Sequence, residues 1–179
     1  MNIGFDLDKI FVDYPPLIPD SLIDKLYKKK SDGKLLYRIP SYPEQILRRL
    51  SHLQFFRPTI KENINFLQSI PKGNHKLYLI SSRFSFLEKT TNTLIKKLSF
   101  DKIFDGMYFN FQNKQPHEFK NEVLQRLHID RYVDDDLYLL KYVAKKNKDM
   151  QFFWLNPQKG KHLLTRNITA INSLIDMLE

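Results

Sequence analysis

The chain has 179 residues, of which 42% are hydrophobic and 27% are charged. These values exclude a disordered chain and predict one globular domain with room for a small insert. The 29 Lys and Arg residues outnumber the 20 Asp and Glu residues, and the net charge of +9 favours anionic partners such as phosphorylated metabolites, nucleotides or nucleic acid. Cysteine is absent, so disulfides, thiolate metal ligands and cysteine nucleophiles are excluded.

The apolar runs are only as long as strands, whereas a membrane span needs about 20 apolar residues, so no membrane partner is predicted. The first residues contain acids too early for the apolar core of a secretory signal, and we expect a cytoplasmic protein. The basic residues are dispersed in short clusters. A solvated basic surface is therefore favoured over a dedicated nucleic-acid patch, although nucleic acid stays open as a partner.

Strand-like apolar runs alternate with helical patterns along most of the chain, which is typical of a parallel sheet with crossover helices. Five strands are expected, at residues 2–5, 76–80, 106–111, 131–133 and 151–155. The spacing of apolar residues predicts helices around residues 60–70, 87–98, 119–127 and 168–178. The predicted fold class is α/β, a Rossmann-like parallel sheet of about five strands with helices on both faces.

The segment between the first two strands is too long for one crossover helix. Apolar spacing in it predicts short helices around residues 22–26 and 46–53, separated by Pro and Gly residues. We expect residues 1–12 and 57–179 to form the core, and residues 13–56 to form a small, mainly helical cap. Such an insert lies at the carboxyl edge of the sheet, where ligands bind, so it is either a lid or a structural insertion.

Two carboxylates, Asp6 and Asp8, directly follow the first strand. Residues two apart in an extended chain point the same way, so both can meet one cation or one reactive centre. Taken alone, the pattern is equally compatible with two solvated loop aspartates.

The second strand ends in Ser81-Ser82-Arg83. A hydroxyl at a strand end can bind a phosphate oxygen together with backbone N–H groups, and helix capping is the alternative role for a serine there. Arg83 either binds an anion or lies in solvent.

Further charged groups follow the third and fourth strands. Lys114 and Lys120 lie where a lysine can neutralise both a carboxylate nucleophile and an incoming phosphate. Asp134, Asp135 and Asp136 follow the fourth strand, and their mutual repulsion predicts a divalent cation with oxygen ligands. The alternative is a helix that begins here with Asp136 as its N-cap, and such a helix is compatible with a bound cation.

The order of these four groups resembles the four motifs of the haloacid dehalogenase-like (HAD) hydrolases. The run Phe5-Asp6-Leu7-Asp8-Lys9-Ile10-Phe11-Val12-Asp13 is similar to the opening FDLDGTLVD of that superfamily. The segment from Arg57-Pro58-Thr59-Ile60 to Leu79-Ile80-Ser81-Ser82-Arg83 is similar to the one that carries its second motif. The resemblance covers about residues 3–155, and nucleotidase-type members are the most similar because of the doubled aspartate and the helical insert.

The resemblance implies a Mg²⁺-dependent phosphomonoester hydrolase with a small phosphorylated substrate, a nucleotide being one candidate. Asp6 would be the nucleophile that forms an aspartyl-phosphate, and Asp8 the general acid and then the base. The implied phosphate-binding residues are Ser81, Ser82, Arg83 and Lys120, with Lys120 preferred over Lys114 because it begins an anchored helix. The implied Mg²⁺ ligands are Asp6, the backbone carbonyl of Asp8, and Asp135 with Asp134 beside it.

Lys9 departs from the resemblance, because it replaces a Gly that helps the chain turn away from the strand. It indicates either a different turn or an impaired site, and its charge is expected close to the phosphate. Two alternatives therefore stay open: a nucleic-acid end-processing phosphatase, and a non-catalytic HAD-like protein that binds phosphate or nucleic acid. A phosphoacceptor signalling domain is disfavoured, because the third strand ends in Phe109-Asn110-Phe111 without an acid.

Overall fold

The computed structural model describes residues 1–15, 28–31, 34–53, 55–71, 73–156 and 162–178. The strands of its large sheet are β1 (Asn2–Phe5), β4 (Lys76–Ser81), β5 (Gly106–Phe109), β6 (Arg131–Asp134), β7 (Gln151–Leu155), β8 (His162–Thr165) and β9 (Ile168–Ile171). Their order is β5-β4-β1-β6-β7-β9-β8, and every neighbouring pair is parallel except β8 with β9. The predicted α/β, Rossmann-like sheet is confirmed, with seven strands in place of about five.

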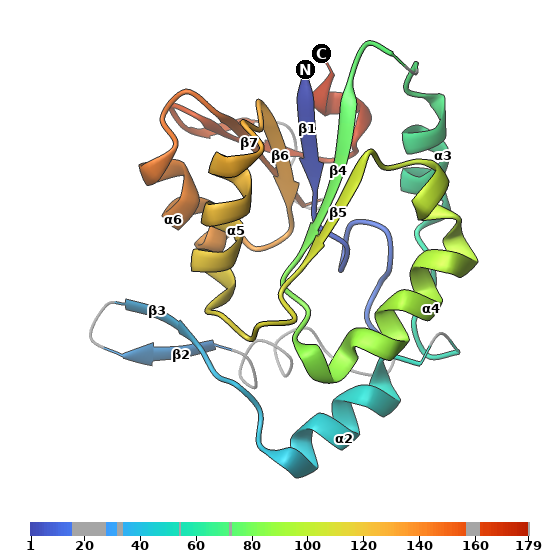
Figure 1. The fold of residues 1–179 in the computed structure, drawn as a ribbon. Helices are drawn as coiled ribbons and strands as arrows, with labels where there is room; N and C mark the ends of the chain where they lie inside the picture. The colour runs from blue at the N-terminus through green and yellow to red at the C-terminus, as the bar shows by residue number, and fades with distance from the viewer. Residues whose placement is uncertain (16–27, 32–33, 54, 72, 157–161, 179) are drawn as a thin grey trace.

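Helices cover both faces of this sheet, as predicted (Figure 1). One face carries α3 (Lys61–Ser69) and α4 (Glu88–Leu98), and the other carries α5 (Pro116–Arg126) and α6 (Leu137–Lys146). Asp136 caps α6, since its carboxylate accepts hydrogen bonds from the backbone N–H groups of Tyr138 and Leu139 at 2.9 and 3.2 Å. The helix-cap role considered for Asp136 is therefore confirmed.

The core consists of two apolar layers, one on each face of the sheet. Ile3 and Phe5 belong to the layer under α3 and α4, whereas Tyr132 belongs to the layer under α5 and α6. Gly4 faces the second layer, where an added Cβ atom would lie 2.9 Å from the ring of Tyr132. The strand before Asp6 therefore needs glycine at this point for the ring to pack.

The predicted helix around residues 168–178 is wrong. The chain there forms the β8–β9 hairpin and then a single 3₁₀ turn, Ile175–Met177. The apolar residues Ile168 and Ile171 fit a helical spacing, but β-branched residues also favour strands, and β9 adds to the parallel edge of β7. The side chain of Asn167 fixes the turn by donating to the carbonyls of Ala144, Asn147 and Met150.

The insert differs in part from the mainly helical cap expected. Its described residues form a hairpin of β2 (Lys28–Ser31) and β3 (Lys34–Tyr37), followed by the helix α2 (Tyr42–Ser51). The helix expected around residues 46–53 is thus present, and the one expected around 22–26 lies outside the described residues. Glu44 stabilises the start of α2 by accepting from the backbone N–H of Ser41 at 2.7 Å.

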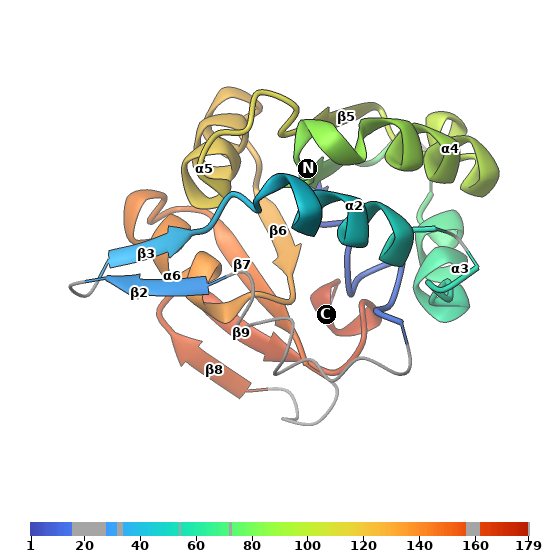
Figure 2. The same cartoon turned by 90° about the horizontal axis from the view of Figure 1, so that it is seen from below.

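The two ends of the insert lie side by side. Val12 forms an antiparallel bridge with Thr59, and the N–H of Asp13 donates to the carbonyl of Pro58 at 2.9 Å. This two-stranded stem places the hairpin and α2 beyond the carboxyl ends of β1, β4 and β6 (Figures 1 and 2). Among the described helices, none is long and apolar enough to cross a membrane.

Candidate active site

The carboxyl ends of three neighbouring strands bring the sequence motifs together. β1 lies between β4 and β6, so Asp6, Ser81 and Asp134 meet at one edge of the sheet. A cavity of about 150 Å³ opens there between the core and the insert. Its lining includes the predicted residues Asp6, Asp8, Ser81, Ser82, Arg83, Lys120, Asp134 and Asp135. These eight predicted residues therefore face the same space.

Lys120 lies at the centre of the acidic cluster. Its Nζ is 2.9 Å from Oδ1 of Asp6 and 2.7 Å from Oδ2 of Asp134, and the side chain is buried. Burial acts to lower the pKa of Lys120, but the two carboxylates raise this pKa well above its usual value, so the amine stays charged. Lys114, the competing candidate, is exposed and pairs with Glu122 at 2.6 Å outside the cavity.

Three carboxylates share this one cation. Carboxylate oxygens of Asp6, Asp134 and Asp135 lie within 4.8 Å of one another. Burial raises the pKa of Asp6 to about 7 against the opposing charge of Lys120, and the charge of Asp134 adds to the rise. Burial and then the charges of Asp134 and Asp6 raise the pKa of Asp135 well above its usual value. The cluster thus has less positive than negative charge, and its hard oxygen donors fit Mg²⁺.

Asp134 and Asp135 differ in what already binds them. Asp134 accepts from Lys120, from the hydroxyl of Tyr132 at 2.9 Å and from the N–H of Asp136 at 2.9 Å. Within the described part of the chain, no group donates a hydrogen bond to the carboxylate of Asp135. The carboxylate oxygens of Asp135 are therefore more available to a metal ion, whereas those of Asp134 orient Lys120.

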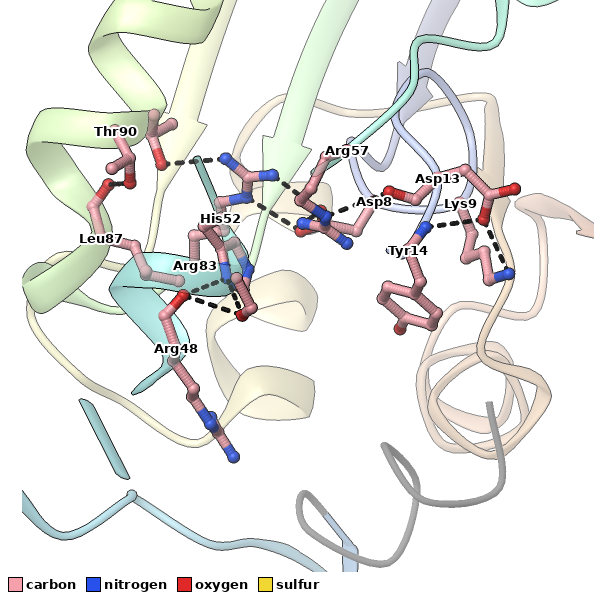
Figure 3. A network of polar contacts seen from close by, with 12 residues as sticks. Asp8, Lys9, Asp13, Tyr14, Arg48, His52, Arg57, Arg83, Leu87 and Thr90 are labelled. Carbon is pink, nitrogen blue, oxygen red and sulfur yellow. Dashed lines mark hydrogen bonds and ion pairs between the residues drawn. The ribbon is translucent and has the colours of Figure 1, made fainter. Parts of the chain in front are cut away.

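Asp8 lies in a second cluster with two arginines (Figure 3). Arg83 donates to its carboxylate from Nε at 2.9 Å and from Nη2 at 2.7 Å, and Arg57 donates from Nη1. Burial would raise the pKa of Asp8, but Arg83 and then Arg57 hold it well below its usual range. The alternative that Arg83 lies in solvent is wrong, because Arg83 is buried and binds Asp8.

Ser81 and Ser82 offer hydroxyls to the cavity. Ser81 is buried at the end of β4, and Oγ of Ser82 is a buried atom with no hydrogen-bond partner among the described residues. The first turn after these serines has Phe84 rather than Ser82 at its N-cap position. Ser82 therefore does not cap this turn, and its hydroxyl is available to a ligand.

Lys9 adopts the left-handed conformation that glycine favours, with φ of 63°. The turn is thus kept without glycine, at a cost of about 1 kcal/mol. Its Nζ lies 2.8 Å from Oδ1 of Asp13 and 4.6 Å from the ring centre of Tyr14 (Figure 3). The charge of Lys9 is directed to the stem of the insert rather than into the cavity where it was expected.

Three residues of the site went unrecognised in the sequence. Arg57 binds Asp8, and the hydroxyl of Tyr37 donates to Asp136 at 2.8 Å. Nδ1 of His52 lies 2.8 Å from the carbonyl of Arg48, which makes Nδ1 the donor. Burial, with Arg57 and Arg83 nearby, lowers the pKa of His52 to about 3, so this ring is neutral. The one available signal was the place of Arg57 at the return of the insert.

No family model matches the chain, and no curated protein sequence matches it. Among solved structures, a haloacid dehalogenase-like hydrolase from Streptococcus pneumoniae is 16% identical with a TM-score of 0.55, over 87% of this chain and 84% of that one. A HAD-superfamily hydrolase from Ehrlichia chaffeensis is 12% identical with a TM-score of 0.56, over 98% and 93% of the two chains.

The D,D-heptose 1,7-bisphosphate phosphatase of B. bronchiseptica, solved with magnesium and phosphate, is 10% identical with a TM-score of 0.53. This match covers 99% of this chain and 98% of that one. At such low identities the likeness concerns the fold, and it agrees with the resemblance seen in the four motifs. The chain has the fold of the HAD-superfamily hydrolases.

Proposed function

We propose that the protein is a phosphatase, a Mg²⁺-dependent phosphomonoester hydrolase that forms an aspartyl-phosphate on Asp6. The observation that carries the proposal is the position of Lys120 between Asp6 and Asp134, beside Asp135, at the base of a cavity. The neighbour solved with magnesium and phosphate supports the same chemistry. A small phosphorylated molecule is the proposed substrate, with a nucleotide as one candidate.

In the first step, a carboxylate oxygen of Asp6 attacks the phosphorus atom, and the bond from phosphorus to the leaving oxygen breaks. A carboxylate attacks a phosphoryl group only where negative charge is compensated, and Lys120 already contacts Asp6. The hydroxyls of Ser81 and Ser82 line the same cavity and can donate to the phosphoryl oxygens. Positioning and charge compensation are thus provided by the core of the protein.

Mg²⁺ would be held by Asp6, Asp135 and the backbone carbonyl of Asp8. Asp135 is preferred over Asp134, because Asp134 already accepts hydrogen bonds on both oxygens. When bound, the ion would offset the excess of carboxylates that raises the pKa of Asp6 and Asp135.

Asp8 is assigned the proton transfers. It would protonate the leaving oxygen in the first step, and then take a proton from the water that attacks the acyl-phosphate, which releases inorganic phosphate and restores Asp6. Its low pKa beside Arg83 and Arg57 suits the second role, because the ionised carboxylate can accept this proton directly. The first role requires Asp8 to take up a proton and to leave its pairs with Arg83 and Arg57 when the substrate binds. Arg83, expected to bind phosphate, is in this arrangement a partner of Asp8.

The test is release of phosphate from p-nitrophenyl phosphate and from a panel of phosphorylated metabolites, with and without Mg²⁺. We expect Mg²⁺-dependent turnover that Asp6→Asn abolishes while the protein stays folded, because an amide cannot act as the nucleophile. The matched control is Asp101→Asn, which changes an exposed carboxyl outside the cavity. Turnover retained by Asp6→Asn would remove the proposed nucleophile, and absence of turnover on every substrate would favour a non-catalytic binding protein.

A further inference from the structure

In the helix α2 of the insert, a charged side chain faces inward and apolar side chains face outward. Arg48 is its buried residue and lines the cavity, whereas Ile46, Leu47 and Leu50 are 44%, 65% and 52% exposed. A helix that covers a core normally turns its apolar side chains inward. The outward side of α2 is therefore built to contact something other than the core of its own chain.

Exposed apolar residues continue along the chain on both sides of the helix. We call this set of residues the α2 face and define it as Ile39, Tyr42, Ile46, Leu47, Leu50, Leu53, Phe55 and Phe56. These eight residues are between 43% and 92% exposed and belong to one stretch of 18 residues, numbers 39 to 56. Figures 1 and 2 show α2 as the outermost element at this end of the molecule.

The α2 face is large for a monomer. A large side chain presents roughly 150–250 Å² when fully exposed, so the eight residues together present on the order of 800 Å². The largest apolar patch of a typical monomer is about 300–600 Å². A standard stable interface buries about 800 Å² on each partner, which is the area available here.

We propose that the α2 face is the interface of a symmetric homodimer, with a second copy of this chain as its occupant. A two-fold interface joins the same patch on both copies, so the apolar area of one copy is matched by that of the other.

The net charge of each copy sets the salt dependence of this dimer. Two chains of charge +9 repel each other, and salt screens this repulsion while it leaves apolar contacts in place. Dimerisation should therefore strengthen as salt is raised. Binding of the α2 face to an anionic lipid surface would have the opposite dependence, because its attraction is electrostatic.

The experiment is sedimentation velocity of the full chain from about 1 to 100 µM, at about 0.05 M and 0.5 M NaCl. We expect a monomer–dimer equilibrium that shifts to dimer at the higher salt. Leu47→Glu should raise the dissociation constant at least roughly 100-fold, since it buries a charge twice in a symmetric contact. Phe55→Ser should also raise the dissociation constant. The matched control is Leu163→Glu, because Leu163 on β8 is 66% exposed and lies outside the α2 face.

Three outcomes would overturn the proposal. The first is a monomer at every concentration and salt. The second is a dimer that Leu163→Glu disrupts and Leu47→Glu does not, which would place the interface elsewhere. The third is flotation of the monomer with phosphatidylcholine vesicles that contain phosphatidylserine, lost at high salt and in Leu47→Glu, which would make the α2 face a lipid-binding surface. Thermal melts of each variant verify that these exposed positions leave the fold intact.

Discussion

Asp6 and Asp8 are two residues apart, yet their surroundings are opposite. Asp6 shares one lysine with two further carboxylates, and its pKa is raised to about 7. Asp8 is alone between Arg57 and Arg83, and its pKa is lowered. The Asp6 cluster has one cation for three carboxylates, whereas the Asp8 cluster has two cations for one carboxylate. The two carboxyls of an Asp-x-Asp motif can therefore take different roles. Burial acts to raise the pKa of both, and the neighbouring charges make the two pKa values differ.

The largest expected effect concerns the lysine of the Asp6 cluster. Lys120→Ala should lower turnover by roughly 10² or more, because it removes a preorganised charge from the nucleophile. Lys114→Ala is the control and should stay within a few fold, since Lys114 pairs with Glu122 at the surface. Steady-state kinetics of both variants on one substrate provide the measurement. An inactive Lys114→Ala enzyme beside an active Lys120→Ala enzyme would reverse the assignment.

In the Asp8 cluster, removing the acid should destabilise the protein. Asp8→Asn leaves Arg57 and Arg83 buried without their shared counter-charge, and breaking such a pair costs about 3 kcal/mol. Urea unfolding at pH 7 measures the difference. Turnover should also fall, because an amide cannot carry the proton. Unchanged stability would mean that water or other groups solvate the two guanidinium groups.

In the Asp6 cluster, removing an acid should have the opposite effect. Asp135→Asn relieves repulsion with Asp134 and Asp6, so the metal-free protein should gain about 1 kcal/mol at pH 8. The same variant should bind Mg²⁺ more weakly, and added Mg²⁺ should raise its melting temperature less than that of the parent. Thermal melts with Mg²⁺ and with a chelator test both expectations. A loss of stability in the chelated variant would instead indicate a structural role for Asp135.

The last prediction concerns the pH dependence contributed by Asp6. A carboxyl whose pKa is about 7 in the folded protein and near 3.8 when unfolded stabilises the fold while it is protonated. This contribution is fully present below pH 4 and is lost as the pH rises to about 7. Asp8 acts in the other direction, since its contribution is present above pH 4 and is lost in acid. We therefore expect the free energy of unfolding of the metal-free Asp6→Asn variant to fall less between pH 4.5 and 8 than that of the parent. Urea unfolding at several pH values in this range provides the measurement.

The sequence predicted the sheet and the Asp6 cluster because their signals are local. Each acid, serine or lysine follows or begins an element with its own apolar pattern, and parallel strands bring their carboxyl ends to one edge. Lys120 was preferred over Lys114 for the same reason, since an anchored helix holds it. Ser82 and Asp135 are likewise next to strand ends.

The Asp8 cluster and the C-terminal hairpin could not be predicted in this way. Arg57 is 49 residues from Asp8, and a single arginine carries no pattern that names its partner. Ile168 and Ile171 fit both a helix and a strand, and the free edge of β7 decides between them. Both features depend on contacts that exist only once the sheet has formed.

The stem of the insert also bears on how much this region can vary. Asp13 and Pro58 are joined by a backbone hydrogen bond, so the chain enters and leaves the insert at nearly one point. For a segment closed in this way, the entropic cost to the core grows only with the logarithm of its length, by about 0.6 kcal/mol for each doubling. Lengthening, shortening or exchanging the residues between these two positions should therefore leave the core almost as stable as before, provided that Arg57 and Tyr37 keep their contacts with Asp8 and Asp136. Under the proposed function, we therefore expect the wall of the cavity that these residues form to be the part of the molecule that can be altered to accept a different substrate.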